Sequence, residues 1–398
     1  MRWASALSED PTLFGAVSAC SGKILEKLGA GGAPDLVMVF ASPHYDQEKQ
    51  RIAAVVQKRF PRARVIGCMG AGIIGEGLEI EGAPAFSLTA AHLPGVTLSL
   101  FHVTDADLPT PDDGPDAWRS IVGTEPDAYP HFILLADPFS MNTESLIEGL
   151  DFAFPSAAKI GGLASGGSTP GSHALYFNDE EYRDGAVGVA MTGNLVVDTV
   201  VAQGCRPIGK PMRVTEVEQN MLITADDKPP METLQELFRE MDPREQALAQ
   251  RNLFMGVAMD PLLEHAQRGD FLIRNIVGVN PSLGTIAVGT QLREGQLVQF
   301  HVRDADTSAE DLRASLTDYL SASGNRAVSA ALMFQCSGRG HGLYGHPGHD
   351  TGMFHELLGV LPVGGFFCNG EIGPVAGETY LHGYTSSFAI FRERAGGD

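Results

Sequence analysis

The chain repeats a unit of strand, helix, strand and glycine-rich turn, and this repeat restricts its fold more than any other feature does. In the first copy, the apolar run 35–40 is typical of a buried strand, and apolar side chains at helical spacing follow over 46–60. Pro61 ends the helix, the run 63–68 predicts a returning strand, and glycines follow at 70–72. A unit of this order predicts a sheet with a helix packed on one face.

A second copy has the same order, with a strand at 131–135, a helix at 142–154 and a returning strand at 157–162. Both copies place a glycine six residues after the proline that ends the helix; the pairs are Pro61 with Gly67 and Pro155 with Gly161. Chance seldom produces such agreement, so we interpret the two copies as one structural unit used twice.

A weaker third copy lies towards the C-terminus, with a strand at 330–336, a helix face over 353–358 and a returning strand and turn at 362–370. Further strand-like sequence follows each copy, at 85–103, 186–201 and 380–391. Because several strands follow each helix, we expect an α/β protein with mixed rather than purely parallel β-sheets and packed helices.

The region between the second and third copies has its own pattern. It predicts a helix at 231–241, strands at 271–279, 285–288 and 297–302, and a helix opened by a capping box at Thr307 and Glu310. Two prolines at 229–230 follow an acidic polar run and mark the best boundary. We therefore expect two domains, 1–230 and 231–398.

Charge and composition restrict the partners. The chain has 28 basic and 49 acidic residues, a net charge of −21, which repels phosphate backbones and anionic lipid headgroups. Nucleic acid and membrane are therefore not expected partners. The N-terminus lacks the basic and apolar regions of a signal peptide, and no segment approaches the roughly 20 apolar residues that cross a bilayer, so we expect a cytoplasmic protein. The five cysteines are widely spaced and form no C-x-x-C pair, which argues against a disulfide framework and a zinc finger.

The run 204–209 is the first candidate for a ligand site, because it combines Cys205 and Arg206 with glycines after a predicted strand. Glycine lets the backbone approach a ligand, arginine binds anions at two points, and the thiol is a soft contact. The alternative is a tight turn between strands with a small buried cysteine.

The run 336–342 is a second candidate, because it follows a buried strand, where α/β folds place ligand sites. It contains Cys336 and Arg339, and a nearby arginine would favour the reactive thiolate. The alternatives are a flexible glycine loop and covalent catalysis by Cys336 with His341, an arrangement that geometry rather than sequence distance identifies.

Histidines crowd the segment 341–355, at His341, His346, His349 and His355. Histidine is a common ligand of metals and of haem. The glycines and prolines between them favour a disordered surface loop instead, so we predict no metal site and no cofactor and keep haem as an alternative.

The turn 369–374 closes the third copy and contains Asn369 and Glu371. A carboxylate held between glycines can accept hydrogen bonds from an ammonium group or from backbone amides. The alternative is a capped turn with a solvated glutamate. Elsewhere the glycine runs match neither a dinucleotide loop, nor a P-loop, nor a nucleophile elbow.

Taken together, these residues resemble the FIST family (F-box and intracellular signal transduction proteins), and the resemblance extends from about residue 3 to 392. The N-terminal FIST pattern is similar to 36–72, 136–138, 160–162 and 204–215, and the C-terminal pattern to 336–340, 364–366, 370–374 and 382–385. The first domain, 1–230, would then be FIST N-terminal-like and the second, 231–398, FIST C-terminal-like.

The resemblance implies a sensory module that binds small ligands such as amino acids. Bacterial members are fused to, or encoded beside, histidine kinases, cyclases and chemoreceptors, and one branch binds haem and senses nitric oxide. Eukaryotic members follow an F-box. This chain shows neither an F-box nor an output domain, so we expect its signal to pass to a separate partner.

Our leading hypothesis is a stand-alone, non-enzymatic ligand sensor with its pocket where glycine loops from both halves converge. Arg206 and Arg339 would hold a carboxylate and Glu371 an ammonium group, as suits an amino-acid-like zwitterion, and Cys205 and Cys336 would lie in the wall. Asn369 is also predicted as a ligand-binding residue. The rivals are a haem-binding nitric-oxide sensor, a protein-interaction scaffold without a ligand, and an enzyme that uses Cys336.

Overall fold

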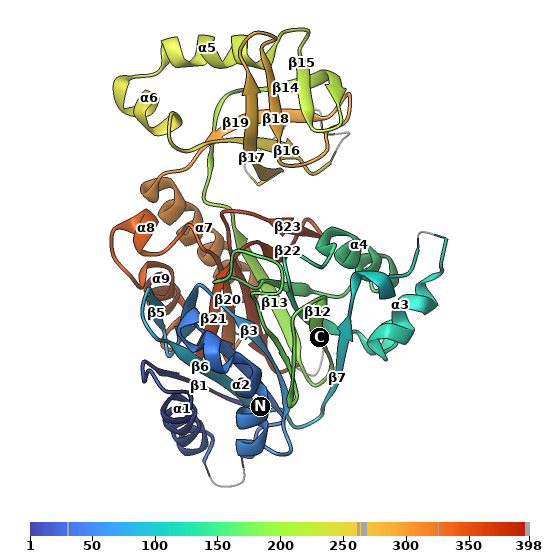
Figure 1. Cartoon of the computed structure of the whole chain (residues 1–398), viewed down its shortest axis with the longest axis vertical. Helices are drawn as coiled ribbons and strands as arrows, with labels where there is room; N and C mark the ends of the chain where they lie inside the picture. The colour runs from blue at the N-terminus through green and yellow to red at the C-terminus, as the bar shows by residue number, and fades with distance from the viewer. Residues whose placement is uncertain (30–31, 111, 261–262, 264–268, 325, 395–398) are drawn as a thin grey trace. The chain divides into compact units, whose positions relative to one another are not determined.

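The computed structural model describes residues 1–398 apart from 30–31, 111, 261–262, 264–268, 325 and 395–398 (Figure 1). The chain forms two compact units. The first unit comprises residues 1–202, 313–381 and 385–398, and the second comprises 203–312 and 382–384. The expected domain boundary after residue 230 lies at the first residue of a helix, α5 (Pro230–Glu240), within the second unit.

Within the described residues, the first unit holds three six-stranded sheets. In sheet order, the first consists of β1 (Arg2–Ser8), β6 (Phe86–His92), β2 (Leu36–Ala41), β3 (Arg64–Met69), β10 (Leu175–Phe177) and β11 (Glu180–Tyr182). The second consists of β7 (Val96–Val103), β12 (Ala186–Gly193), β8 (His131–Ala136), β9 (Lys159–Leu163), β22 (Glu371–Val375) and β23 (Glu378–His382). The third consists of β13 (Val196–Ala202), β24 (Ser386–Arg392), β20 (Ala330–Cys336), β21 (Val363–Cys368), β4 (Gly72–Gly75) and β5 (Leu78–Glu81).

The three sheets are built alike, one from each copy of the repeat. In each, the two strands that flank the helix run parallel (β2 with β3, β8 with β9, β20 with β21) and an antiparallel strand follows on one side (β6, β12, β24). The prediction of mixed sheets built from three copies is therefore confirmed.

The copies also exchange strands in a circle. The hairpin of the first copy, β4–β5, extends the sheet of the third, the hairpin β10–β11 of the second extends the first, and the hairpin β22–β23 of the third extends the second. The last strand of the first copy, β7, pairs with β12 of the second, and the last strand of the second, β13, pairs with β24 of the third. The N-terminal strand β1 takes the equivalent position beside β6 of the first copy. The first unit thus has pseudo-threefold symmetry closed by its own N-terminal strand.

One glycine recurs at the same register in each sheet. Gly67, Gly161 and Gly365 pair with the fourth residue of β2, β8 and β20, and at each of them a side-chain carbon would overlap the carbonyl oxygen of the neighbouring strand. The first two are the glycines that follow the helix-ending prolines. In the third copy the spacing from Pro362 is shorter, which explains why this copy is weaker in sequence.

Alternate side chains of these strands enter two layers. Met38 and Phe40 of β2 join an inner core to which β8, β9, β20 and β21 contribute, whereas Val37 and Val39 pack under helices. The helices are α1 (Leu13–Leu28) and α2 (Lys49–Arg59) on the first sheet, α3 (Pro115–Val122) and α4 (Thr143–Ala153) on the second, and α8 (His341–Tyr344) and α9 (His349–Leu358) after β20. The strand period of two therefore separates a central core from helix-covered outer faces.

The second unit is a closed barrel, traced through its described residues in the order β14-β15-β18-β17-β16-β19. Its elements are β14 (Arg206–Glu218), β15 (Met221–Ala225), α5, α6 (Pro243–Ala249), β16 (Leu253–Ala258), β17 (Phe271–Asn280), β18 (Thr285–Val288) and β19 (Leu297–Val302). A long helix, α7 (Ala305–Ser323), begins in this unit and ends in the first. Among the described residues, no helix has the length and apolar character needed to cross a membrane.

Candidate ligand-binding sites

The turns that follow β3, β9 and β21 meet one another in the first unit. Ala71, Ser165 and Asn369 hold equivalent positions, four residues after the recurrent glycine. The Ser165 amide donates to Met69 (3.1 Å), and the Asn369 amide donates to Leu163 (3.2 Å). The third link of the ring uses a side chain, because the Ala71 amide donates to the Ser165 hydroxyl (2.8 Å), which donates to the Phe367 carbonyl.

These turns therefore converge as the repeat suggested, but their polar groups satisfy one another. Asn369 is exposed, and its side-chain amide donates to the Ala164 carbonyl (3.3 Å). Glu371, in contrast, is buried at the start of β22, where its Oε2 accepts hydrogen bonds from the Thr385 amide (3.1 Å) and hydroxyl (2.8 Å). The role of these two residues in ligand binding stays a prediction.

Cys336 ends β20 and is half-buried, with its Sγ accepting a hydrogen bond from the Gly338 amide (3.5 Å). It lies opposite the buried Cys368 in the parallel register. The equivalent residues of the other copies are Ser42 and Asp137. The backbone amide of each of the three donates to the carbonyl of the residue directly before β6, β12 or β24. The equivalent positions at the ends of β2, β8 and β20 thus carry three different polar side chains.

Arg339 is completely buried and already bound by an acid. Its Nε and Nη2 donate to the two carboxylate oxygens of Asp350 (2.6 and 3.1 Å), and Nη2 also donates to the Tyr344 hydroxyl (2.6 Å). Burial by itself would raise the pKa of Asp350, but the Arg339 guanidinium and a bond from His349 outweigh burial and lower this pKa to about 2. The ion pair therefore fixes the turn after β20 to α9, and a ligand carboxylate would have to displace Asp350.

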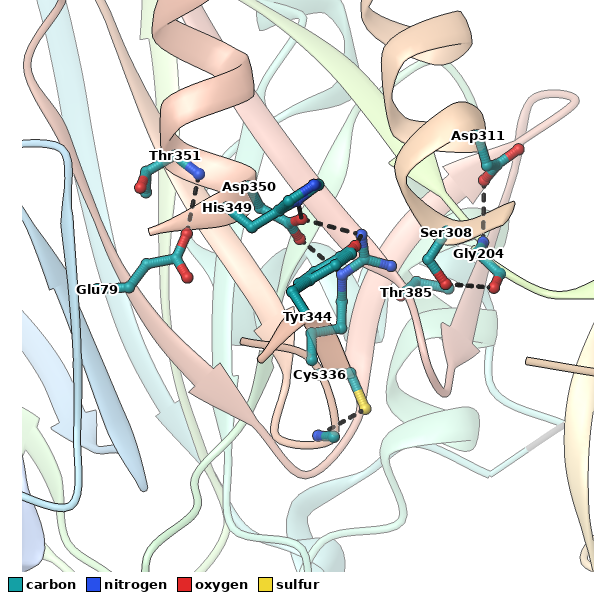
Figure 2. A network of polar contacts seen from close by, with 12 residues as sticks. Glu79, Gly204, Ser308, Asp311, Cys336, Tyr344, His349, Asp350, Thr351 and Thr385 are labelled. Carbon is teal, nitrogen blue, oxygen red and sulfur yellow. Dashed lines mark hydrogen bonds and ion pairs between the residues drawn. The ribbon is translucent and has the colours of Figure 1, made fainter. Parts of the chain in front are cut away.

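The histidines of this segment are largely ordered by neighbours. His349 stacks on the Tyr344 ring, with centroids 3.6 Å apart, and its Nδ1 bonds Asp350 (3.0 Å), as Figure 2 shows. His355 bonds the Leu361 carbonyl through Nε2 (3.2 Å). The expected disordered loop is instead two short helices, α8 and α9. In the part of the chain that the structure describes, no three His, Cys, Asp or Glu side chains are grouped for a metal ion.

Two acids of the first copy, which the sequence did not indicate as site residues, hold this segment. Glu79 on β5 is buried and accepts the Thr351 amide at the first turn of α9 (2.8 Å; Figure 2), and burial raises the pKa of Glu79. Glu81 accepts the His341 amide (2.8 Å). No local signal could have found them, because only the exchanged hairpin brings these residues to the third copy.

In the second unit, Arg206 opens β14 beside a cavity of about 570 Å³. Its Nε donates to Asp304 and its Nη2 to Glu245, both at 3.2 Å. The cavity is lined by Arg206, Asp242, Arg244, Glu245, Ala247, Leu248, Arg251, Asn252, Asp304, Asp306 and Thr307. Among the described residues, Arg244, Arg251 and Asp306 have no ion-pair partner. The cavity therefore offers a ligand both positively charged guanidinium groups and a negatively charged carboxylate.

The neighbouring Cys205 is buried in a different environment, a cluster of apolar residues that includes Phe254, Phe271 and Ile273. The six predicted site residues are therefore divided between the units. Cys205 and Arg206 belong to the second, and Cys336, Arg339, Asn369 and Glu371 to the first.

Comparison with known proteins agrees with this organisation. The FIST N domain model matches residues 35–228, and the FIST C domain model matches residues 230–374. The chain belongs to the FIST family. FIST domains are generally sensory domains of signal transduction that bind small ligands.

Full-length relatives of this FIST protein occur in mycobacteria. An uncharacterized protein of Mycobacterium tuberculosis is 35% identical over 98% of this chain and 100% of its own length. An F-box/LRR-repeat protein of Arabidopsis thaliana is 23% identical, over 77% of this chain and 67% of the relative. Among solved structures, a cyanuric acid hydrolase from A. caulinodans aligns over 99% of both chains with 11% identity and a TM-score of 0.36, a similarity too low to support an argument.

Proposed function

We propose that this FIST protein is a cytoplasmic, non-enzymatic sensor of an amino acid or a related small metabolite, and that it passes its signal to a separate protein such as a histidine kinase or a cyclase. Membership of a family of small-ligand sensory domains supports the class of function. The observation that carries the choice of ligand is the cavity beside Arg206.

The charges of this cavity suit a zwitterion. Arg244 and Arg251 are exposed and unpaired among the described residues, so their guanidinium groups can bind a carboxylate at two points. Asp306 is likewise exposed and can accept hydrogen bonds from an ammonium group. A volume of about 570 Å³ lies in the range of small-molecule sites.

Calorimetric titration with the twenty standard amino acids tests the proposal. We expect saturable binding of at least one of them, and at least about a tenfold loss of affinity in Arg251→Ala, because one charge-assisted hydrogen bond contributes ~1.5–3 kcal/mol. Asp306→Asn should weaken the amino acid but not its deaminated analogue. Arg62→Ala, a matched loss of an exposed arginine outside the cavity, should bind normally.

Two results would contradict this function. If none of the amino acids binds at millimolar concentration, the ligand class is wrong. A Soret band in protein expressed with ample haem, lost on substitution of a single histidine, would favour the haem-binding alternative instead.

A further inference from the structure

A second arginine of the barrel unit, Arg303, lies directly after β19 and is buried, with 5% of its surface exposed. Its guanidinium carbon lies 5.2 Å from the centroid of the Tyr384 ring. The Tyr384 hydroxyl bonds the Asn275 side chain, and Phe254 packs on the ring with centroids 4.3 Å apart. The aromatic surface beneath the guanidinium is therefore held in place from two directions.

Carboxylates bind the arginine side chain along the edge formed by Nε and Nη2. Arg303 Nε and Nη2 are buried and have no hydrogen-bond partner among the described residues. Two other buried arginines use the same pair of nitrogens to bind a carboxylate: Arg339 binds Asp350 (2.6 and 3.1 Å) and Arg392 binds Asp198 (2.8 and 3.4 Å). Buried charged donors without partners are costly, so the Arg303 edge favours a carboxylate that the described residues do not supply.

The residues next to Arg303 on β14 and β19 explain why no acid of these two segments pairs with its guanidinium. The pairing of Arg206 with Val302 places Cys205 opposite Arg303, and Cys205 belongs to the apolar cluster with Phe254. The next residue, Asp304, is bound by Arg206 and by the Thr307 amide (2.7 Å). Successive residues point to opposite faces of a strand pair, so Arg303 and the Arg206 cavity use different faces of β14 and β19.

We propose that the Nε–Nη2 edge of Arg303 binds the carboxylate of a small molecule, whose apolar part packs on the wall formed by Tyr384, Phe254 and Cys205. A planar two-point contact suits a carboxylate better than a single-point anion such as chloride. This site goes beyond the proposed function, because it is separate from the Arg206 cavity.

Nuclear magnetic resonance of the arginine Nε–H groups tests the proposal in the full chain. The Arg303 signal is assigned by its loss in Arg303→Lys, which keeps the charge but removes the fork, with Arg303→Gln as a second variant if the first does not fold. Titration with sodium acetate should then move this signal saturably, whereas equal concentrations of acetamide or sodium chloride should not. A shift that is absent, unsaturable or shared with either control overturns the proposal.

A second measurement needs no variant. A wild-type crystal grown in chloride and soaked in acetate should show a carboxylate across Nε and Nη2, and a water or chloride there after the soak overturns the proposal. Arg251→Ala separates the two sites, because it should weaken amino-acid binding in the Arg206 cavity at least about tenfold and leave the acetate response of Arg303 intact. Loss of that response in Arg251→Ala would show that the two sites are not separate and overturn the proposal.

Discussion

Arg339 and Asp350 form a two-point ion pair in which neither side chain is exposed to solvent. Removal of one member leaves the other as an uncompensated buried charge, which is more costly than the pair is stabilising. The pair joins the end of β20 to the first turn of α9, so its loss should be felt across the third copy of the repeat.

Asp350→Asn should therefore lower the free energy of unfolding of the first unit by about 3–5 kcal/mol, measured by urea titration. Glu356→Gln provides a matched control, since it breaks the two-point pair of Arg313 with Glu356, whose side chains are 47% and 58% exposed. The control should have a much smaller effect, because solvent screens an exposed pair. Equal effects of the two substitutions would contradict the argument.

Because His301 is buried, we expect the stability of the barrel to fall at acid pH. Burial lowers the pKa of His301 from 6.5 to about 4, only partly offset by a hydrogen bond to the Gln299 carbonyl. As pH falls from 6.5 towards 4, the unfolded chain binds a proton that the folded barrel excludes. Stability is therefore present above pH 6.5 and lost through this window, by up to roughly 3 kcal/mol.

Hydrogen exchange of the β16 and β19 amides between pH 7 and 4, corrected for intrinsic rates, would measure this loss. His301→Gln should flatten the pH dependence in that window. Val298→Ala, a core truncation on the same strand, should instead lower protection by a similar amount at every pH. An unchanged slope in His301→Gln would assign the acid sensitivity to other groups.

Ser165 closes the ring of turns in the first unit. Ser165→Ala removes the hydroxyl that links the Ala71 amide to the Phe367 carbonyl, and leaves both backbone groups without this partner. Thermal and urea unfolding should show a loss of about 1–3 kcal/mol. Ser120→Ala removes an exposed serine hydroxyl that donates to the Asp116 carbonyl (2.9 Å), and it should change stability very little.

The recurrent glycine can be tested in the third copy. Gly365→Ala would push a methyl group into the Met333 carbonyl oxygen, and because backbone cannot move aside cheaply we expect little or no folded protein by circular dichroism. Gly22→Ala, on α1 with open space around the new methyl group, should be neutral or stabilise by up to ~1 kcal/mol. Normal folding of Gly365→Ala would refute the equivalence of the three positions.

Cysteine labelling tests the expectation that Cys336 is not a catalytic nucleophile. Cys336 is half-buried, whereas Cys20, Cys68, Cys205 and Cys368 are buried, and burial raises the pKa of the Cys68 and Cys368 thiols. Iodoacetamide at neutral pH should label Cys336 first, at the rate of an ordinary accessible thiol. Labelling that is orders of magnitude faster, and abolished in Cys336→Ser, would support the enzymatic alternative.

Much of the fold follows from local sequence. The runs at 35–40, 46–60 and 63–68 became β2, α2 and β3, because apolar periodicity and helix-ending prolines act on neighbouring residues. The third copy and the strands β17, β18 and β19 were found for the same reason. The family resemblance added the class of function, which periodicity does not contain.

The candidate sites were only partly predictable. Arg206 does line a cavity, but Arg339 is held by Asp350. Arg303, whose Nε and Nη2 have no partner in the described part of the chain, gave no sequence signal. The sequence shows that an arginine carries a positive charge. Whether an acid of the same chain neutralises that charge depends on which strands and helices pack together.

The repeat of strand, helix, strand and glycine turn was thus determined by the sequence alone, because each of its signals acts within a few residues. Only the tertiary structure decided that the copies exchange hairpins and close into a ring, which brings Glu79 to Thr351 across 272 positions. Strand pairing between copies depends on matching edges and shared cores. Those are properties of the assembled chain, and they select the side chains that meet at each site.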